Sequence, residues 1–110
     1  MDLIVDANTL EAVAREHSDN KHLLRRDSLK IGLISVRPNE ALPAHSHPKE
    51  EQFYYVLEGE GVLRLGEKDH PLRPGLAVSI PPGIVHGVRN LGPHALRFLD
   101  IFIDWSAQAG

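Results

Sequence analysis

The chain has 110 residues, of which 42% are hydrophobic and 25% are charged, so its length and composition fit one ordinary globular domain. The formal net charge of −3, with no stripe of lysine and arginine, argues against a nucleic-acid partner. There is no cysteine, no apolar run that could span a bilayer and no signal peptide, so we expect a cytoplasmic protein without disulfides or a membrane partner.

Residues 1–28 are expected to form an N-terminal arm and the first strand. Asn8 followed three residues later by Glu11 has the pattern of a capping box, and the apolar residues after Asn8 lie at helical spacing. This pattern predicts a short helix over residues 8–16, with an arm that lacks regular structure as the alternative.

Residues 29–104 read as short strands separated by glycine, proline and asparagine turns, which is typical of an antiparallel sandwich or barrel. We expect residues 52–59 and 61–66 to form one hairpin. Residues 85–90 and 95–104 are expected to pair in the same way. The whole chain, residues 1–110, is predicted to be a single domain.

The last strand carries apolar side chains on both of its faces, although an antiparallel strand with one wet face should alternate. One face holds Leu99, Ile101 and Ile103, and the other holds Leu96, Phe98 and Phe102. The second apolar face needs cover, either from the N-terminal segment or from a partner subunit. We therefore predict a homodimer.

Two blocks of sequence carry the candidate functional residues. The first, AHSHPKEEQFYYVLEGEG, contains His45, His47 and Gln52, and the second, PGLAVSIPPGIVHGVRN, contains His86 after a Pro-Pro-Gly turn. Side chains two residues apart on a strand point to one face at about 6.6 Å between their Cα atoms, so His45 and His47 could bind one metal ion. A surface histidine pair is the alternative for these two residues considered alone.

Together the blocks resemble the two motifs of the cupin family, G-x5-H-x-H-x(3,4)-E-x6-G and G-x5-P-x-G-x2-H-x3-N. The second motif is matched at every named position. The first departs at its opening glycine, where Asn39 or Glu40 stands, and at its glutamate, where Gln52 stands. The resemblance implies a small single-domain cupin of the cupin 2, RmlC-like type. Its fold would be an all-β jelly roll, or double-stranded β-helix barrel, with a short N-terminal helix or arm.

The resemblance also implies a metal site formed by His45, His47 and His86 with a fourth ligand from the first motif. Gln52 shares one strand face with Tyr54, and this face is expected to be the barrel interior, whereas Glu51 points the other way. Gln52 is therefore the predicted ligand. Glu51 is the alternative, and it would need a β-bulge to reverse its direction.

Three neutral imidazoles and one amide leave the charge of a divalent ion uncompensated, so we expect an anionic small-molecule ligand. The donor set suits Fe, Mn, Ni, Zn, Co or Cu. Three functions remain open from the sequence: a metal-dependent dioxygenase or isomerase, a non-catalytic sensor or carrier, and a metal-free isomerase or epimerase. Tyr54 is a possible catalytic residue, although an inward aromatic side chain is more often part of the core.

Overall fold

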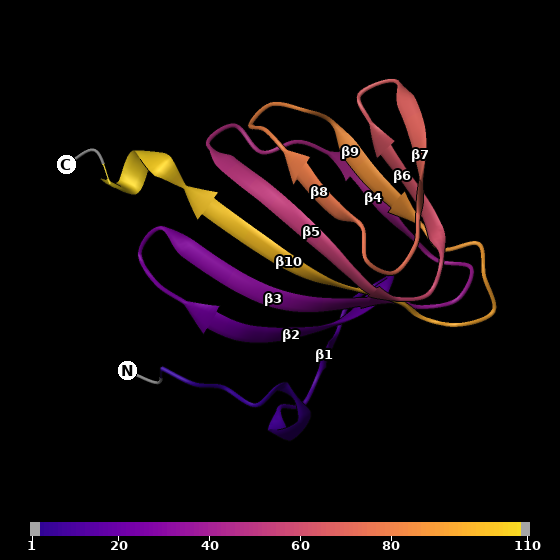
Figure 1. Cartoon of the computed structure of the whole chain (residues 1–110), viewed down its shortest axis with the longest axis horizontal. Helices are drawn as coiled ribbons and strands as arrows, with labels where there is room; N and C mark the ends of the chain where they lie inside the picture. The colour runs from indigo at the N-terminus through magenta and orange to yellow at the C-terminus, as the bar shows by residue number, and fades with distance from the viewer. Residues whose placement is uncertain (1–2, 109–110) are drawn as a thin grey trace.

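The computed structural model describes residues 3–108, which form two antiparallel β-sheets (Figure 1). The strands are β1 (Val13–Ala14), β2 (Ser18–Arg25), β3 (Leu29–Val36), β4 (Ala41–His45), β5 (Glu50–Glu58), β6 (Gly61–Leu65), β7 (Lys68–Leu72), β8 (Ala77–Ile80), β9 (His86–Arg89) and β10 (Leu96–Asp104). One sheet has the order β1-β2-β3-β10-β5-β8 and the other the order β4-β9-β6-β7. This arrangement confirms the predicted all-β fold.

The only helices within residues 3–108 are two short 3-10 helices, η1 (Ala7–Thr9) and η2 (Trp105–Gln108). The prediction of a helix over residues 8–16 is therefore wrong. Asp6 rather than Asn8 caps η1, by accepting from the Asn8 backbone N–H at 2.9 Å, and the chain is already extended at Leu10. A helix this short is marginal in water, and pairing of β1 with β2 gives the segment a more stable alternative. No helix in this described part of the chain is long enough to span a membrane.

The predicted hairpin between β5 and β6 is also wrong, because the two strands belong to different sheets. β5 pairs with β10 and β8, whereas β6 pairs with β9 and β7. The chain changes sheets at Gly59, which has φ +86° and approaches so closely that a Cβ would lie 2.5 Å from the Ala95 carbonyl oxygen. Glycine at a sheet crossover and glycine in a hairpin turn give the same local signal.

The predicted pairing of residues 85–90 with residues 95–104 fails for the same reason. β9 lies in the four-stranded sheet, and β10 lies in the centre of the six-stranded sheet (Figure 1). Buried Asn90 holds the connection between them, since its side-chain Nδ2 donates to the carbonyl oxygens of Val36 and His94 and its Oδ1 accepts from Gly92 N–H. Asn90, the last position of the second motif, therefore has a structural role in this connection.

The hydrophobic core lies between the two sheets. Its buried members are Val36, Tyr54, Val56, Leu63, Leu72, Ile80, Val88, Leu96 and Phe98. Because side chains alternate along a strand, the inward rows of β5 and β10 place two polar residues, Gln52 and Asp100, in line with these apolar ones. The interior therefore contains buried polar groups beside the apolar core.

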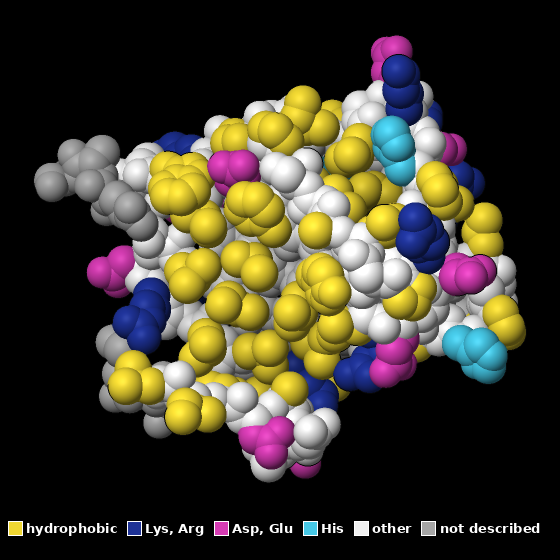
Figure 2. All heavy atoms as spheres, in the orientation of Figure 1, with side chains coloured by type: hydrophobic (Ala, Val, Ile, Leu, Met, Phe, Trp, Pro, Cys, Tyr) yellow, Lys and Arg dark blue, Asp and Glu magenta, His cyan; other side chains and the backbone are white. Residues whose placement is uncertain are grey.

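The outward rows of β5, β10 and β3 form an apolar surface, which we call the outer face. Figure 2 shows hydrophobic side chains spread over this face of the six-stranded sheet. Cross-strand neighbours here are Tyr55 with Leu99 and Phe53 with Ile101, and Tyr55 is 45% exposed. The face expected to need cover, which holds Leu96 and Phe98, therefore lies in the core, and the exposed apolar face of β10 is the other one, with Leu99 and Ile101.

Candidate metal centre

Three histidines meet at one end of the barrel. His45 ends β4, His86 begins β9 and the two are register partners, while His47 lies in the loop before β5. The ring centroid of His45 lies 4.5 Å from that of His86 and 4.9 Å from that of His47. One ligand atom from each residue falls within 4.8 Å of the others, so the three imidazoles can share one ion.

Backbone carbonyl groups orient two of these rings. His45 Nδ1 lies 2.8 Å from the carbonyl oxygen of Pro43, and His86 Nδ1 lies 2.9 Å from that of Ile84. A ring that donates from Nδ1–H presents the lone pair of Nε2, which is the usual arrangement of a metal-binding histidine. The carbonyl groups two residues before His45 and His86 thus set the direction of these two rings.

Gln52 is 2% exposed on the inward face of β5, beside Phe102, whose ring centroid lies 5.0 Å from that of His47. Its Nε2 donates to Asp100 Oδ1 at 2.6 Å. Glu51 points outward, where its Oε1 accepts from Trp105 Nε1 at 2.9 Å. The structure therefore places Gln52, and not Glu51, on the side of the histidines.

Among the described side chains, those of residues 3–106, the buried atoms without a hydrogen-bond partner are His47 Nε2, His86 Nε2 and Gln52 Oε1. Leaving such an atom unpaired costs about 1–3 kcal/mol, and native structures contain few of them. All three are atoms of kinds that bind transition metals. Their chemistry therefore fits a divalent ion.

Burial determines the protonation of the centre. Desolvation lowers the pKa of His47, and the neighbouring His45 lowers it further. Desolvation also lowers the pKa of His86, against the opposing effect of its hydrogen bond to the Ile84 carbonyl. Both shifts favour the neutral imidazole, which is the form that binds metal.

Asp100 was not recognised from the sequence as a site residue. It is 9% exposed on the inward face of β10, and burial raises its pKa to about 6, although the Gln52 hydrogen bond opposes this. The available signal was a carboxylate between Phe98 and Phe102 on the inward-facing row of β10. Tyr54 lies beside it, buried in the core, and desolvation followed by the Asp100 charge raises the pKa of its hydroxyl far above the usual value. Tyr54 therefore keeps its proton.

A cavity of about 380 Å³ lies between β2, β3 and β10. Its wall includes Asp100 and Phe102, which contact Gln52 and His47, so the cavity adjoins the candidate centre. Lys30 and Arg25 also line it. The cavity that adjoins the centre therefore carries positive charge on its wall.

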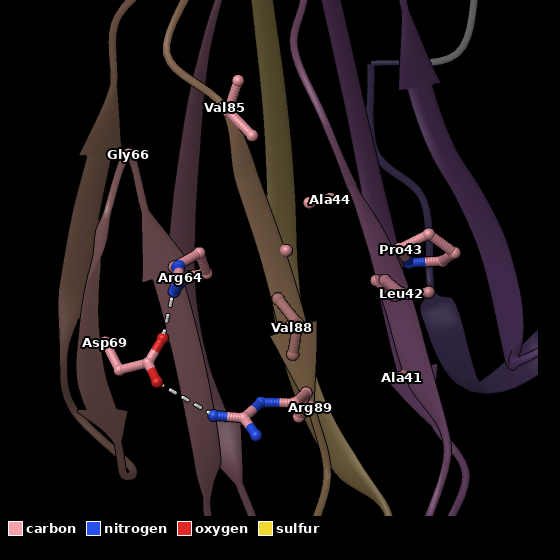
Figure 3. A pocket seen from close by; sticks show the side chains of 11 residues that line it. Ala41, Leu42, Pro43, Ala44, Arg64, Gly66, Asp69, Val85, Val88 and Arg89 are labelled. Carbon is pink, nitrogen blue, oxygen red and sulfur yellow. Dashed lines mark hydrogen bonds and ion pairs between the residues drawn. The ribbon is translucent and has the colours of Figure 1, made fainter.

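A second hollow, of about 530 Å³, lies on the outer side of the four-stranded sheet (Figure 3). Figure 3 shows Arg64 and Arg89 reaching Asp69 from either side, at 3.6 and 3.1 Å. Gly87 lines this hollow, whereas its neighbour His86 is buried on the inward side. This larger hollow is thus separated from the histidines by the sheet itself.

Comparison with known proteins gives concordant results. A family model described as a cupin domain matches residues 32–102. Protein SchB of Streptomyces halstedii is 40% identical over 69 residues, which are 63% of this chain and 50% of that protein. The oxalate-binding protein of Thermotoga maritima is 29% identical over 91 residues, which are 83% of this chain and 75% of that protein. This chain thus spans half the length of SchB.

A similar solved structure is that of TT1209 from Thermus thermophilus. It has a TM-score of 0.81 and 31% identity, and the match covers 92% of this chain and 96% of that one. The likeness extends over both sheets and confirms the jelly-roll prediction.

Proposed function

Because this chain belongs to the cupin family, we propose that it is a metal-binding protein that binds or converts a small anionic metabolite. The ligands would be His45, His47, His86 and Gln52. The observation that carries the proposal is the group of buried, unpaired ligand atoms on three of these residues. A bound ion would pair all three atoms at once.

The donor set of three imidazole nitrogens and one amide oxygen suits Fe, Mn, Ni, Zn, Co or Cu. A divalent ion bound there would supply Lewis-acid polarisation of an anionic ligand, or activation of O₂ if it were iron. The backbone carbonyl oxygens beside Nδ1 of His45 and Nδ1 of His86 would hold these two rings in place for metal binding. Dioxygenase and isomerase chemistry both fit such a centre.

The charge of the centre favours a monoanionic or dianionic ligand. Four neutral ligands leave a divalent ion with a charge of 2+, which one ionised Asp100 behind Gln52 reduces to about 1+. Lys30 and Arg25 add positive charge at the adjoining cavity. The volume of about 380 Å³ limits the ligand to a small metabolite. The oxalate-binding relative supports a small carboxylate and gives weight to a carrier as the second candidate function.

The apolar outer face supports a homodimer, as proposed from the pattern of β10. Contiguous exposed apolar surfaces are uncommon on monomers, and association would cover Tyr55 and its neighbours. Light scattering of purified protein at micromolar concentration tests this. A monomeric mass under these conditions would refute it.

Metal binding is tested first with the metal alone. Untagged protein is analysed for bound elements, stripped with chelator, and titrated with Co²⁺, Ni²⁺, Mn²⁺ and Zn²⁺ while the melting temperature is followed. We expect at least one ion to raise it, and we expect His47→Ala and His86→Ala to abolish the increase. His70→Ala, at an exposed position on β7, is the matched control. The absence of metal from the purified protein, together with no metal uptake by the stripped protein, would refute the proposed metal site.

The metabolite is tested with the loaded protein. Oxalate, hydroxy acids, diketones and catechols are screened for thermal stabilisation, and O₂ consumption is recorded in parallel. Turnover of any of them would identify an enzyme, whereas tight binding without turnover would identify the carrier. Activity that persists in His47→Ala after its metal is lost would favour a metal-free isomerase or epimerase instead.

A further inference from the structure

The two ends of the Gln52 amide have different surroundings. Nε2 donates to Asp100 Oδ1 at 2.6 Å, whereas buried Oε1 has no partner. An ionised carboxylate only accepts hydrogen bonds, so Asp100 can pair only with the NH₂ end of the amide. This contact therefore decides which way the amide faces.

Strand register makes this contact specific. Gln52 is the cross-strand partner of Phe102, and Asp100 lies two residues along β10 on the same inward row. Diagonal neighbours of this kind are within reach of a long side chain. The neighbours of Asp100 on the inward row of β10 are Phe98 and Phe102, so an ionised carboxylate at this position is costly to bury unless it is paired.

We propose that Asp100 is a positioning residue that fixes the Gln52 amide so that its Oε1 faces the metal ion. Asp100 itself makes no bond to the ion. The inference rests on the proposed metal site. An asparagine at position 100 would lack this effect, because it could pair with either end of the amide and would allow both orientations.

Co²⁺ binding to the stripped protein tests the inference, measured by competition with a chelator and by the visible absorption of the bound ion. Asp100→Asn should weaken Co²⁺ binding about 10- to 100-fold, as is typical when a partner of a metal ligand is replaced. Combining Asp100→Asn with Gln52→Glu should restore at least the wild-type affinity, because Asn can donate to a glutamate that only accepts and the glutamate adds negative charge to the ligand set. Asp69→Asn removes the same charge on the outer side of the other sheet and should leave the affinity unchanged.

A second pair of variants separates orientation from simple charge. In a Gln52→Ala background there is no amide to orient, so adding Asp100→Asn should change Co²⁺ affinity by less than about threefold. An undiminished loss in that background would show that Asp100 acts by its charge alone, and would overturn the inference. Circular dichroism verifies that each variant is folded.

Two other results would also overturn it: wild-type affinity in Asp100→Asn, or a folded double variant with no recovery. These are distinct from failure of the proposed function, which would appear as the absence of Co²⁺ binding by the wild-type protein. In that case both would be rejected together.

Discussion

Asp100→Asn should make the metal-free protein more stable at neutral pH, although the same change is expected to weaken metal binding. Asp100 is 9% exposed, and burial raises its pKa from 3.8 to about 6. Asparagine has nearly the same shape and can bond to the Gln52 amide, but it has no charge to desolvate. The substitution therefore removes the cost of burying an ionised carboxylate and keeps the packing.

The pH dependence follows from the direction of this shift. Between pH 3.8 and about 6 the folded protein holds the Asp100 proton while the unfolded chain has released it, so the free energy of unfolding falls as the pH rises through this window. A difference of roughly two pKa units corresponds to about 3 kcal/mol. Below the window the carboxyl is neutral in both states and the penalty disappears.

Urea denaturation of wild type and Asp100→Asn, followed by circular dichroism with chelator present, measures this from pH 4 to pH 8. We expect nearly equal stability at pH 4 and an advantage of about 3 kcal/mol for the variant above pH 7. Effects of histidine titration common to both proteins cancel in the difference, and added salt should change it little because the group is buried. A flat difference curve, or a less stable variant at neutral pH, would refute the reasoning.

Three further predictions concern other parts of the molecule. Lys30→Ala should weaken oxalate binding about two- to fivefold, and added salt should reduce this effect, whereas the exposed control Lys68→Ala should bind oxalate like the wild type. Calorimetry measures both affinities, and equal oxalate affinity in Lys30→Ala and wild type would contradict a ligand site at this cavity. Leu99→Lys should convert the expected dimer into a monomer by light scattering, and an unchanged dimer mass would place the interface elsewhere. Gly59→Ala should lower the free energy of unfolding by more than about 2 kcal/mol, because its Cβ would meet the Ala95 carbonyl oxygen. Gly66→Ala, also at positive φ but in open space, should lower it by about 1–2 kcal/mol. Equal losses in the two variants would show that the close contact at Gly59 relaxes.

The inward direction of Gln52 could be predicted from the sequence because strand parity is a purely local property. A strand that buries one face fixes the direction of each of its side chains, and Glu51 and Gln52 must then point opposite ways. The spacing of His45, His47 and His86 was informative for a similar reason, since the prolines around them restrict the backbone and Gly83 allows the positive φ of the turn before His86.

Features that depend on distant partners could not be predicted in this way. Gly59 indicates a change of chain direction, but the sequence around it does not tell whether the next strand stays in the same sheet or crosses to the other sheet. The capping pattern at Asn8 was overridden by pairing of β1 with β2. Asp100 gave a visible signal in its strand, but its partner Gln52 lies on another strand far along the chain.

The distribution of the candidate ligands over the two sheets has a mechanical consequence. His45 and His86 belong to the four-stranded sheet, whereas Gln52 belongs to the six-stranded one. An ion bound by all of them would link two sheets whose contact is otherwise mostly apolar packing. Metal binding should then slow hydrogen exchange in β5 and β9 together, rather than in either strand alone.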